Sequence, residues 1–382
     1  MRLVILTPSF LPSCNGMTFA TLQHATMLTE LGHQVSVVAA CPRQHIESVT
    51  RFLSKRGIDF LALDIGGSGL LSRPIVGDVR GSIEQIVRLA PQSALVEGRY
   101  FWGYHLIPLL KDCGIRIALV SHGSSAKRFG FSLDWVARSV VYGLYRWSHE
   151  REILRALDAV AVLSAHEDDD RFRDARLYRR LGLSALVVSN TSVESVAMEV
   201  QKTAAQEGKI RIAVVGDMTP MKNQMAAIGL AEGNESISFV RFFFPAENDY
   251  SHTLVSRARD GGISNFEYCA GLDREAIIRL LGDIDLILCL LRTEAQPLAI
   301  IDGLACGVPF LSTPVGCVPS MKGGVISEVS GMREIIRQLA GDARAMEELA
   351  SEARCFFQAA HSERAVKPAL AALITAAVRE VT

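Results

Sequence analysis

The fold is decided by residues 285–319, which read DLILCLLRTEAQPLAIIDGLACGVPFLSTPVGCVP. Residues 285–291 form a short, nearly unbroken apolar run, as expected for a strand of a parallel sheet that is buried on both faces. Residues 292–296 are more polar, and they predict the loop that leaves the carboxyl end of this strand.

A helix is expected directly after this loop. Pro297 suits the first helical position, because its missing N–H would have no intrahelical partner there and its φ is already helical. The helix should end near Gly307, since glycine is the usual residue just past a helix end and Pro309 cannot extend a helix. Residues 310–313 then resume as a strand.

This arrangement predicts an anion-binding site. It places free backbone N–H groups and the positive end of a helix dipole at the carboxyl edge of a parallel sheet, where open α/β sheets bind ligands. Two acidic residues flank the junction: Glu294 lies in the loop, and Asp302 follows after seven residues, about a turn and a half inside the helix. One carboxylate can face the mouth of the site while the other lies along the helix.

The segment resembles the acidic signature of retaining glycosyltransferases of family four. Their pattern is Glu, seven residues, Glu, and then a run similar to Ala-Met-Ala-Cys-Gly-x-Pro. Glu294, Asp302 and residues 304–309 (LACGVP) occupy those places. The second acid is Asp instead of Glu, so its carboxylate reaches about 1.5 Å less far.

The resemblance implies an α/β protein with the GT-B fold, in which two Rossmann-like domains with parallel sheets face each other across a cleft. A nucleotide-sugar donor would be held mainly by the second domain, and neither a cofactor nor a metal ion is required by that family. The domains expected along this chain are an N-terminal domain on the acceptor side at 1–190, a polar connection at 191–208, a donor domain at 209–355 and a C-terminal helix at 356–382 that packs back on the first domain.

Length and charge agree with this organisation. A chain of 382 residues is long enough for two domains with large cores. Its 40 basic and 41 acidic residues nearly cancel, so no overall charge demands a nucleic-acid partner. No run approaches the roughly 18–20 apolar residues that span a bilayer, and the apolar start ends at Thr7 and Pro8, too early for a signal peptide. We expect a cytoplasmic protein.

The eight cysteines are scattered, without a Cys-x-x-Cys pair or metal-ligand spacing. This pattern predicts reduced cysteines that mostly serve as small buried hydrophobes. It gives no indication of a metal site.

The first half opens with a βαβ unit, because residues 3–6 and 34–39 are strand-like and residues 18–31 are helix-like. In the resembled family the loop after the first strand is rich in glycine and faces the phosphates or sugar of the donor. Asn15 and Gly16 stand where the pair of glycines is usual. The alternative is a surface turn shaped by the Asn-Gly pair.

His122 follows an apolar strand at residues 115–120, so it lies at the edge of the sheet where ligands bind. In the resembled family a histidine in this position points at the donor sugar. The alternative is a histidine with a purely structural role.

The second half repeats the strand–loop–helix pattern, with a strand at 210–215 followed by Gly216 and by Lys222 just before a helix. Lys222 matches a family lysine, and an ammonium group there is well placed to pair with a diphosphate. Asp217 stands in place of the family's arginine, so Arg292 is the alternative cation. Without the neighbouring motif, Lys222 would be an ordinary surface lysine.

The resemblance also implies the roles of the site residues. Glu294 orients the sugar or stabilises its oxocarbenium-like centre, His122 binds a sugar hydroxyl, and Asp302 accepts hydrogen bonds from the ribose. The complete donor-binding set is Asn15, Gly16, Gly216, Lys222, Arg292, Ala295, Gln296, Pro297, Leu298 and Asp302.

Two further stretches allow more than one interpretation. Residues 132–157 predict a long helix rich in aromatic and basic side chains, which either lies on a membrane surface or packs on the sheet as an amphipathic helix. Residues 66–69 (GGSG) lack the Lys-Ser/Thr of a phosphate-binding loop and predict a mobile loop.

These observations favour a retaining glycosyltransferase. It would move a sugar from a nucleoside-diphosphate donor to a glycan, lipid-linked or small-molecule acceptor, and polysaccharide biosynthesis is the common case in the resembled family. Two alternatives stay open: a nucleotide-sugar epimerase on the same fold, and a binding partner that has lost catalysis. Asp217, Asp302 and Ser320, each of which departs from the family pattern, suggest the second alternative.

Overall fold

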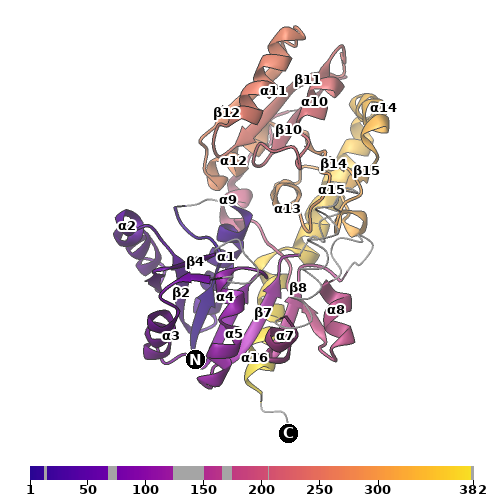
Figure 1. Cartoon of the computed structure of the whole chain (residues 1–382). Coiled ribbons are helices and arrows are strands. Elements are labelled where there is room, and N and C mark those ends of the chain that lie inside the picture. The colour runs from indigo at the N-terminus through magenta and orange to yellow at the C-terminus, as the bar shows by residue number, and fades with distance from the viewer. Residues whose placement is uncertain (13–14, 68–74, 124–149, 166–173, 205, 380–382) are drawn as a thin grey trace, which may run out of the picture. The chain divides into compact units, whose positions relative to one another are not determined.

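The computed structural model describes residues 1–12, 15–67, 75–123, 150–165, 174–204 and 206–379 (Figure 1). The chain divides into two compact units. Unit 1 comprises Met1–Val188 and Lys367–Thr382, and unit 2 comprises Ser189–Val366. Each unit is built around its own parallel sheet, as the alternation of apolar strands and helices predicts.

Within the described residues, the main sheet of unit 1 has seven strands in the order β3-β2-β1-β6-β7-β8-β9, and all pairs are parallel. The chain first builds strands on one side of β1 and then returns to build β6 and its successors on the other side. The strands are β1 (Arg2–Leu6), β2 (Gln34–Ala40), β3 (Ile58–Leu63), β6 (Ser93–Glu97), β7 (Arg116–Ser121), β8 (Ala159–Val162) and β9 (Ala185–Val187).

All the described helices of unit 1 except α16 connect these strands. The helices are α1 (Gly16–Glu30), α2 (Arg43–Ser54), α3 (Val79–Arg88), α4 (Trp102–His105), α5 (Ile107–Asp112), α7 (Arg151–Arg155), α8 (Asp174–Arg180) and, from Lys367 onward, α16 (Glu363–Val378). The Lys367 ammonium of α16 pairs with the Glu30 carboxylate at the end of α1, at 2.6 Å.

The glycine run after β3 is partly structured. Gly66 and Gly67 belong to β4 (Ile65–Gly67), which pairs in antiparallel fashion with β5 (Ile75–Gly77). The prediction of a mobile loop is therefore wrong for these two glycines, because their backbone groups are hydrogen-bonded in a short ribbon. Gly69 and most of the expected helix at 132–157 lie outside the described residues.

Unit 2 repeats the strand order of unit 1. Its described sheet runs β12-β11-β10-β13-β14-β15, again with every pair parallel. The strands are β10 (Ile210–Val215), β11 (Ile237–Phe244), β12 (Phe266–Ala270), β13 (Leu286–Cys289), β14 (Phe310–Ser312) and β15 (Gly324–Ile326). The described helices are α9 (Glu194–Glu199), α10 (Met225–Ala231), α11 (Asp249–Asp260), α12 (Arg274–Leu280), η2 (Leu281–Asp283), α13 (Leu298–Ala305), η3 (Val318–Ser320), α14 (Val329–Ala340) and α15 (Ala343–Ala360).

The apolar run at 285–291 is buried on both faces, as predicted. Leu286, Leu288 and Leu290 belong to one hydrophobic cluster, whereas Ile287 and Cys289 belong to another. Because successive side chains of a strand point to opposite faces, a sheet covered on both sides requires an unbroken apolar run rather than an alternating one. Helix α13 covers one of these faces with Ile300, Ile301 and Leu304.

The helix of this motif begins one residue later than predicted. Pro297 is the N-cap, with φ −74° and ψ 115°, and the helix itself starts at Leu298. Cys306 caps the other end, and Gly307 follows with a positive φ of 66°, as the sequence indicates. Proline is tolerated both as the N-cap and as the first helical residue, because the backbone N–H of neither position donates an intrahelical hydrogen bond.

Three other expectations differ from the structure. The stretch 191–208, expected as a polar connection, contains helix α9, and residue 356 lies inside α15 rather than at the start of a final helix. The expectation that most cysteines are buried is wrong for the described chain: seven are unpaired, but only Cys289, Cys306 and Cys317 are buried. These three lie in or beside the β13–α13 motif, where small apolar side chains are packed.

Candidate active site

The candidate site of unit 2 lies where the strand order reverses. β10 and β13 are neighbours in the sheet, but the chain leaves β10 toward β11 on one side and leaves β13 toward β14 on the other. Open α/β sheets bind ligands in the crevice that this reversal produces at the carboxyl ends of the strands. The segments that begin there are residues 216–224 after β10 and residues 290–297 after β13.

These two segments bring Lys222 and Glu294 together. The Lys222 ammonium donates a hydrogen bond to the Glu294 Oε2 atom, and each side chain is 27% exposed. Burial disfavours the charged ammonium, but the Glu294 carboxylate outweighs it and raises the pKa of Lys222 above its usual value. An ammonium and a carboxylate, 72 residues apart in the sequence, thus share a partly open position at the reversal point.

Arg292 lies beside this pair. Its backbone N–H donates to the Met221 carbonyl at 3.0 Å, and its guanidinium Nη2 lies 3.4 Å from the side-chain oxygen of Asn223. The exposed Arg292 is therefore attached to the same turn that carries Lys222. Asp217 is exposed at the start of this turn, where its carbonyl accepts a hydrogen bond from Gln224 at 2.7 Å. Its carboxylate adds negative charge to the Lys222 region.

Two glycines give these loops their shape. Gly216 follows β10 with φ 134°, a conformation that side chains disfavour. Gly316 has φ 53°, and a Cβ atom there would lie 2.1 Å from the Glu294 carbonyl oxygen. The next residue, Cys317, donates its N–H to the Ala295 carbonyl at 3.0 Å. Segment 316–317 therefore supports the loop of Glu294, a contact that the sequence reasoning did not identify.

The junction between loop and helix contains the next three predicted residues. The N–H of Ala295 lies 3.3 Å from the Glu294 Oε1 atom. Pro297 is buried at the N-cap of α13, and Leu298 is the partly exposed first residue of the helix. The start of α13 and the Glu294 carboxylate are therefore adjacent, as the motif requires.

Gln296 is buried, and its side chain binds another segment of unit 2. The amide oxygen accepts the Asn190 N–H at 2.7 Å, and the amide nitrogen lies 2.9 Å from the Ser189 hydroxyl. The His361 Nδ1 atom lies 2.9 Å from the same hydroxyl. Both ends of the Gln296 amide are thus engaged within the protein, so this side chain anchors the motif to residues 189–190.

Asp302 is also engaged within the protein. It is 5% exposed, and its Oδ1 and Oδ2 atoms lie 2.7 and 3.0 Å from the Nη2 and Nε atoms of Arg274. The Ser192 hydroxyl donates to Oδ1 at 2.6 Å, and Arg274 donates to the Thr191 carbonyl at 3.0 Å. This buried pair joins α12, α13 and residues 191–192. The ribose contact of Asp302 remains a prediction, and Arg274 is a partner that the sequence reasoning missed.

In unit 1, Asn15 caps helix α1. Its side-chain oxygen accepts the Thr18 N–H at 3.0 Å, and its amide nitrogen donates to the Ser9 hydroxyl at 2.9 Å. Gly16 is the first residue of the helix. Asn15 thus has a local structural role at the carboxyl end of β1, and the donor contact of this pair remains a prediction.

His122 lies directly after β7 and binds Glu97, the last residue of β6. The His122 Nε2 atom lies 2.6 Å from Glu97 Oε2, and the His24 Nδ1 atom of α1 lies 2.6 Å from Glu97 Oε1. Burial raises the pKa of the Glu97 carboxyl group, but the two histidines outweigh this effect and lower the pKa to about 2. The sequence reasoning missed Glu97 and His24, although a carboxylate that ends a buried apolar strand was a usable signal.

A second charged cluster lies at the same edge of this sheet. Arg99 pairs with Glu150 and, at 2.5 Å, with Asp174, whose other oxygen accepts the Ser121 hydroxyl at 2.5 Å. The Arg99 and Glu150 side chains are almost fully buried. One guanidinium thus compensates two buried carboxylates next to the strand end that carries His122.

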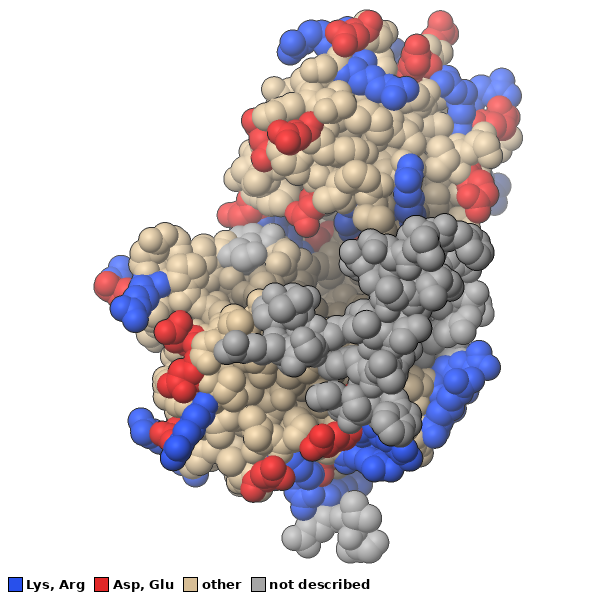
Figure 2. All heavy atoms as spheres, viewed as in Figure 1, with Lys and Arg blue, Asp and Glu red and all other residues tan. Residues whose placement is uncertain are grey.

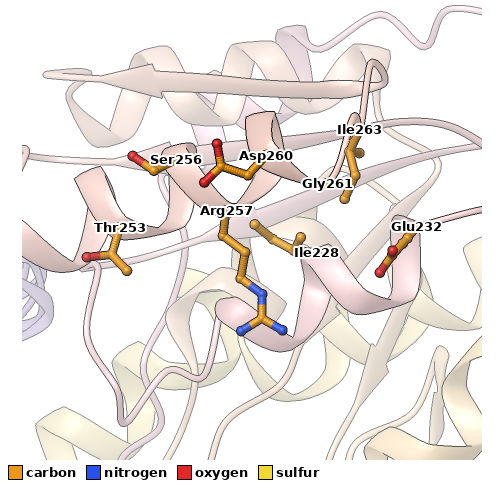
Figure 3. A pocket seen from close by; sticks show the side chains of 8 residues that line it. All are labelled: Ile228, Glu232, Thr253, Ser256, Arg257, Asp260, Gly261 and Ile263. Carbon is orange, nitrogen blue, oxygen red and sulfur yellow. The ribbon is translucent and has the colours of Figure 1, made fainter.

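A separate surface pocket of about 500 Å³ lies between α10 and α11 (Figure 3). Arg257 extends from α11 beside Ile228, and the rim includes Glu232 and Asp260. Glu232 directly follows α10, and Arg257 and Asp260 lie in the last turn of α11, hence toward the amino edge of the sheet. None of the predicted site residues lines this pocket.

Other features of the described residues concern metals, membranes and charge. No group of three potential metal ligands is found among them. In the same part of the chain, no helix combines the length and apolar composition needed to cross a bilayer. On the face that Figure 2 shows, acidic and basic side chains are interspersed over most of the periphery.

Comparisons with known proteins identify the fold. No protein-family model matches the chain, and no curated protein sequence matches it. Solved structures do match over nearly the full length. HepE from Anabaena, crystallised with UDP and glucose, has a TM-score of 0.72 at 13% identity, with 98% of this chain and 99% of that chain covered.

Two further structures agree. A glycosyltransferase from Rickettsia africae has a TM-score of 0.71 at 13% identity, and a sucrose-phosphate synthase from Thermosynechococcus elongatus has a TM-score of 0.69 at 11% identity. Each alignment covers 98% of both chains. The chain therefore has the two-domain α/β fold of GT-B glycosyltransferases, as the motif at 285–319 indicated.

Proposed function

We propose that this protein is a glycosyltransferase that takes a sugar from a nucleoside-diphosphate sugar. The observation that carries the proposal is the Lys222–Glu294 pair, which lies at the reversal point of the unit 2 sheet beside the start of α13. An ammonium and a helix N-terminus attract a diphosphate, and a carboxylate next to them can bind sugar hydroxyls. The UDP and UDP-glucose complexes of HepE support a uridine nucleotide as the first donor to test.

The chemistry follows from the charges. Cleavage of the bond between sugar and diphosphate places negative charge on the leaving group, and preorganised donors stabilise that charge. Lys222, Arg292 and the N–H groups at the start of α13 would supply these donors without a metal ion. Glu294, released from Lys222 by the incoming diphosphate, would orient the sugar and stabilise positive charge at its anomeric carbon.

We further propose retention of the anomeric configuration and a hydroxyl of a glycan, lipid or small molecule as acceptor. The motif of Glu294 and Asp302 supports retention. His122 is proposed to bind a hydroxyl of the donor sugar. Asp302 is proposed to accept a hydrogen bond from the ribose in place of the one that it accepts from the Ser192 hydroxyl.

One observation favours a second candidate, a nucleotide-binding partner without transferase activity. Asp217 adds an exposed carboxylate to the turn of Lys222, where the resembled family has an arginine. Its charge would weaken the attraction of this turn for a diphosphate. Binding would then persist through Lys222 and Arg292, while turnover would be lost.

Thermal unfolding in the presence of UDP, GDP, ADP and their glucose conjugates tests the donor site. A ligand at 100 times its dissociation constant should stabilise the protein by about 2.7 kcal/mol. The stabilisation should fade in Lys222→Ala and persist in Lys209→Ala, which removes an exposed lysine of the same unit. No stabilisation by any of these nucleotides would contradict the proposal.

Turnover of the stabilising donor then separates the candidate functions. A transferase releases the nucleoside diphosphate and forms a product whose anomeric configuration NMR can assign. A binding partner releases no nucleotide, and an epimerase changes the sugar while the nucleotide linkage persists.

A further inference from the structure

The carboxylate of Glu97 lies between two imidazole rings in unit 1. Its Oε1 atom is 2.6 Å from His24 Nδ1, and its Oε2 atom is 2.6 Å from His122 Nε2. Each oxygen therefore has its own histidine partner, which fixes both the position and the rotation of the carboxylate.

Three elements meet at this cluster because of the strand order. Glu97 ends β6, His122 follows β7, and His24 lies on α1, the helix that begins after β1. β1 and β6 are the neighbours between which the strand order of unit 1 reverses, and β7 is the next strand. The cluster therefore occupies the edge of the sheet at which this fold class binds ligands.

The three side chains of the cluster differ in solvent exposure. The side chains of Glu97 and His24 are 0% and 2% exposed, whereas that of His122 is 12% exposed. Of the three, His122 is the residue with surface available to a ligand. Glu97 and His24 lie behind it.

The charge of Glu97 determines which nitrogen of His122 carries a proton. An ionised carboxylate only accepts hydrogen bonds, so each ring nitrogen that faces it must be protonated. The low pKa of Glu97, about 2, keeps the carboxylate ionised at neutral pH. His122 is then protonated at Nε2, and its Nδ1 atom is left to interact with a ligand.

We propose that Glu97 is the positioning residue of His122, and that His24 holds Glu97 in place for this task. The nature of the ligand, a hydroxyl of the donor sugar, rests on the function proposed above. The orientation and tautomer of His122 do not depend on it. A carboxylate behind a functional imidazole is a general means of fixing its tautomer and direction.

The competing explanation is a purely structural cluster, in which Glu97 stabilises unit 1 and His122 has no further role. Both explanations predict that Glu97→Gln lowers stability. Only the positioning role predicts that Glu97 affects catalysis through His122, so the tests below measure the tautomer and the coupling between the two residues.

The first test is NMR of the full-length protein labelled with ¹⁵N at histidine. Long-range proton–nitrogen correlations should assign the neutral His122 ring as protonated at Nε2 and the His24 ring as protonated at Nδ1. An Nδ1-protonated His122 would overturn the proposal. This result needs no substrate, so it stands even if glycosyl transfer is never observed.

The second test is a double-mutant cycle on release of UDP from UDP-glucose, or from whichever nucleotide sugar stabilises the protein. Glu97→Gln should lower kcat by on the order of 10- to 100-fold, the range seen when the carboxylate partner of a metal-bound histidine is removed. The double variant Glu97→Gln, His122→Ala should be no slower than His122→Ala alone. If the two losses multiply, Glu97 does not act through His122 and the proposal fails.

Two further variants make this cycle interpretable. Glu97→Asp keeps the charge and should retain a higher kcat than Glu97→Gln. It also takes the place of Glu97→Gln in the cycle if the Gln variant does not fold. Glu47→Gln makes the same chemical change at an exposed position of α2 and should leave kcat and the His122 tautomer unchanged. Equal loss of kcat in Glu97→Asp and Glu97→Gln at equal stability would contradict a role for the carboxylate charge.

Discussion

Arg274 binds both carboxylate oxygens of Asp302, at 2.7 and 3.0 Å, with both side chains buried in unit 2. Removing one partner of a buried ion pair leaves an uncompensated charge. We therefore expect Asp302→Ala to lower the free energy of unfolding by about 3–5 kcal/mol, measured by urea denaturation.

The double variant Arg274→Met, Asp302→Leu is the control for this prediction. It removes both charges and keeps apolar volume, so it should recover most of the lost stability. If the double variant loses as much unfolding free energy as Asp302→Ala, the uncompensated charge is not the cause of the loss.

Gly316 approaches the loop of Glu294 too closely for any side chain. In Gly316→Ala the new Cβ atom would lie 2.1 Å from the Glu294 carbonyl oxygen, at a φ of 53°. We expect a stability loss of at least about 1–3 kcal/mol from the backbone conformation alone, and weaker nucleotide binding because the Glu294 loop must move.

Gly208→Ala provides the matched control. Gly208 has φ 70°, but a Cβ atom there would meet nothing within 4 Å. Gly208→Ala should therefore lose stability because of its backbone conformation, but it should bind nucleotide as the native protein does. Equal binding by the two variants, measured by isothermal titration calorimetry, would rule out a role for the close approach.

Glu97 should make unit 1 sensitive to acid. Its pKa falls from 4.5 to about 2 on folding, which corresponds to about 3 kcal/mol of stability. Because the folded pKa is the lower one, this contribution is present above pH 4.5 and is lost as the pH falls toward 2.

Glu97→Gln has no such group to titrate. The difference in unfolding free energy between the native protein and this variant should thus be largest near pH 6–7 and should shrink steadily below pH 4.5. Denaturant unfolding at several pH values measures it. A difference that stays constant down to pH 2.5 would contradict the low pKa.

Arg292 should contribute to diphosphate binding, because it is attached to the turn that carries Lys222. Arg292→Ala should weaken UDP binding by roughly tenfold, the effect of losing one hydrogen bond to a charged group. UMP, which lacks the second phosphate, should lose less affinity.

Arg344→Ala, which removes a highly exposed arginine of α15, is the control and should bind UDP as the native protein does. Calorimetric titration of the native protein, Arg292→Ala and Arg344→Ala with UDP and UMP measures these affinities. Equal losses for UDP and UMP in Arg292→Ala would place Arg292 away from the second phosphate.

The strands and the main motif could be predicted from local sequence. The strands predicted at 210–215 and 266–270 match β10 and β12 at both ends, although each contains a charged residue. Pro297 and Gly307 mark the two ends of α13 to within a residue, because each residue type favours a particular backbone conformation at its own position. The order of strands and helices then places Lys222 and Glu294 at adjacent strand ends.

Only the tertiary structure determined which side chains the site residues bind. The motif predicts a ligand contact for Asp302, but it gives no sign that the carboxylate also binds Arg274, 28 residues away, or that Gln296 binds residues 189–190. Glu97 meets His24 across 73 residues.

The physical reason is that periodicity and capping are local properties of the chain. They report which face of an element is buried, but they carry no information about which polar group another element brings to that face. The sequence by itself therefore determined the α/β class, the approximate positions of the strands and the acidic motif, whereas the packing within each unit decided which charges are paired inside the protein.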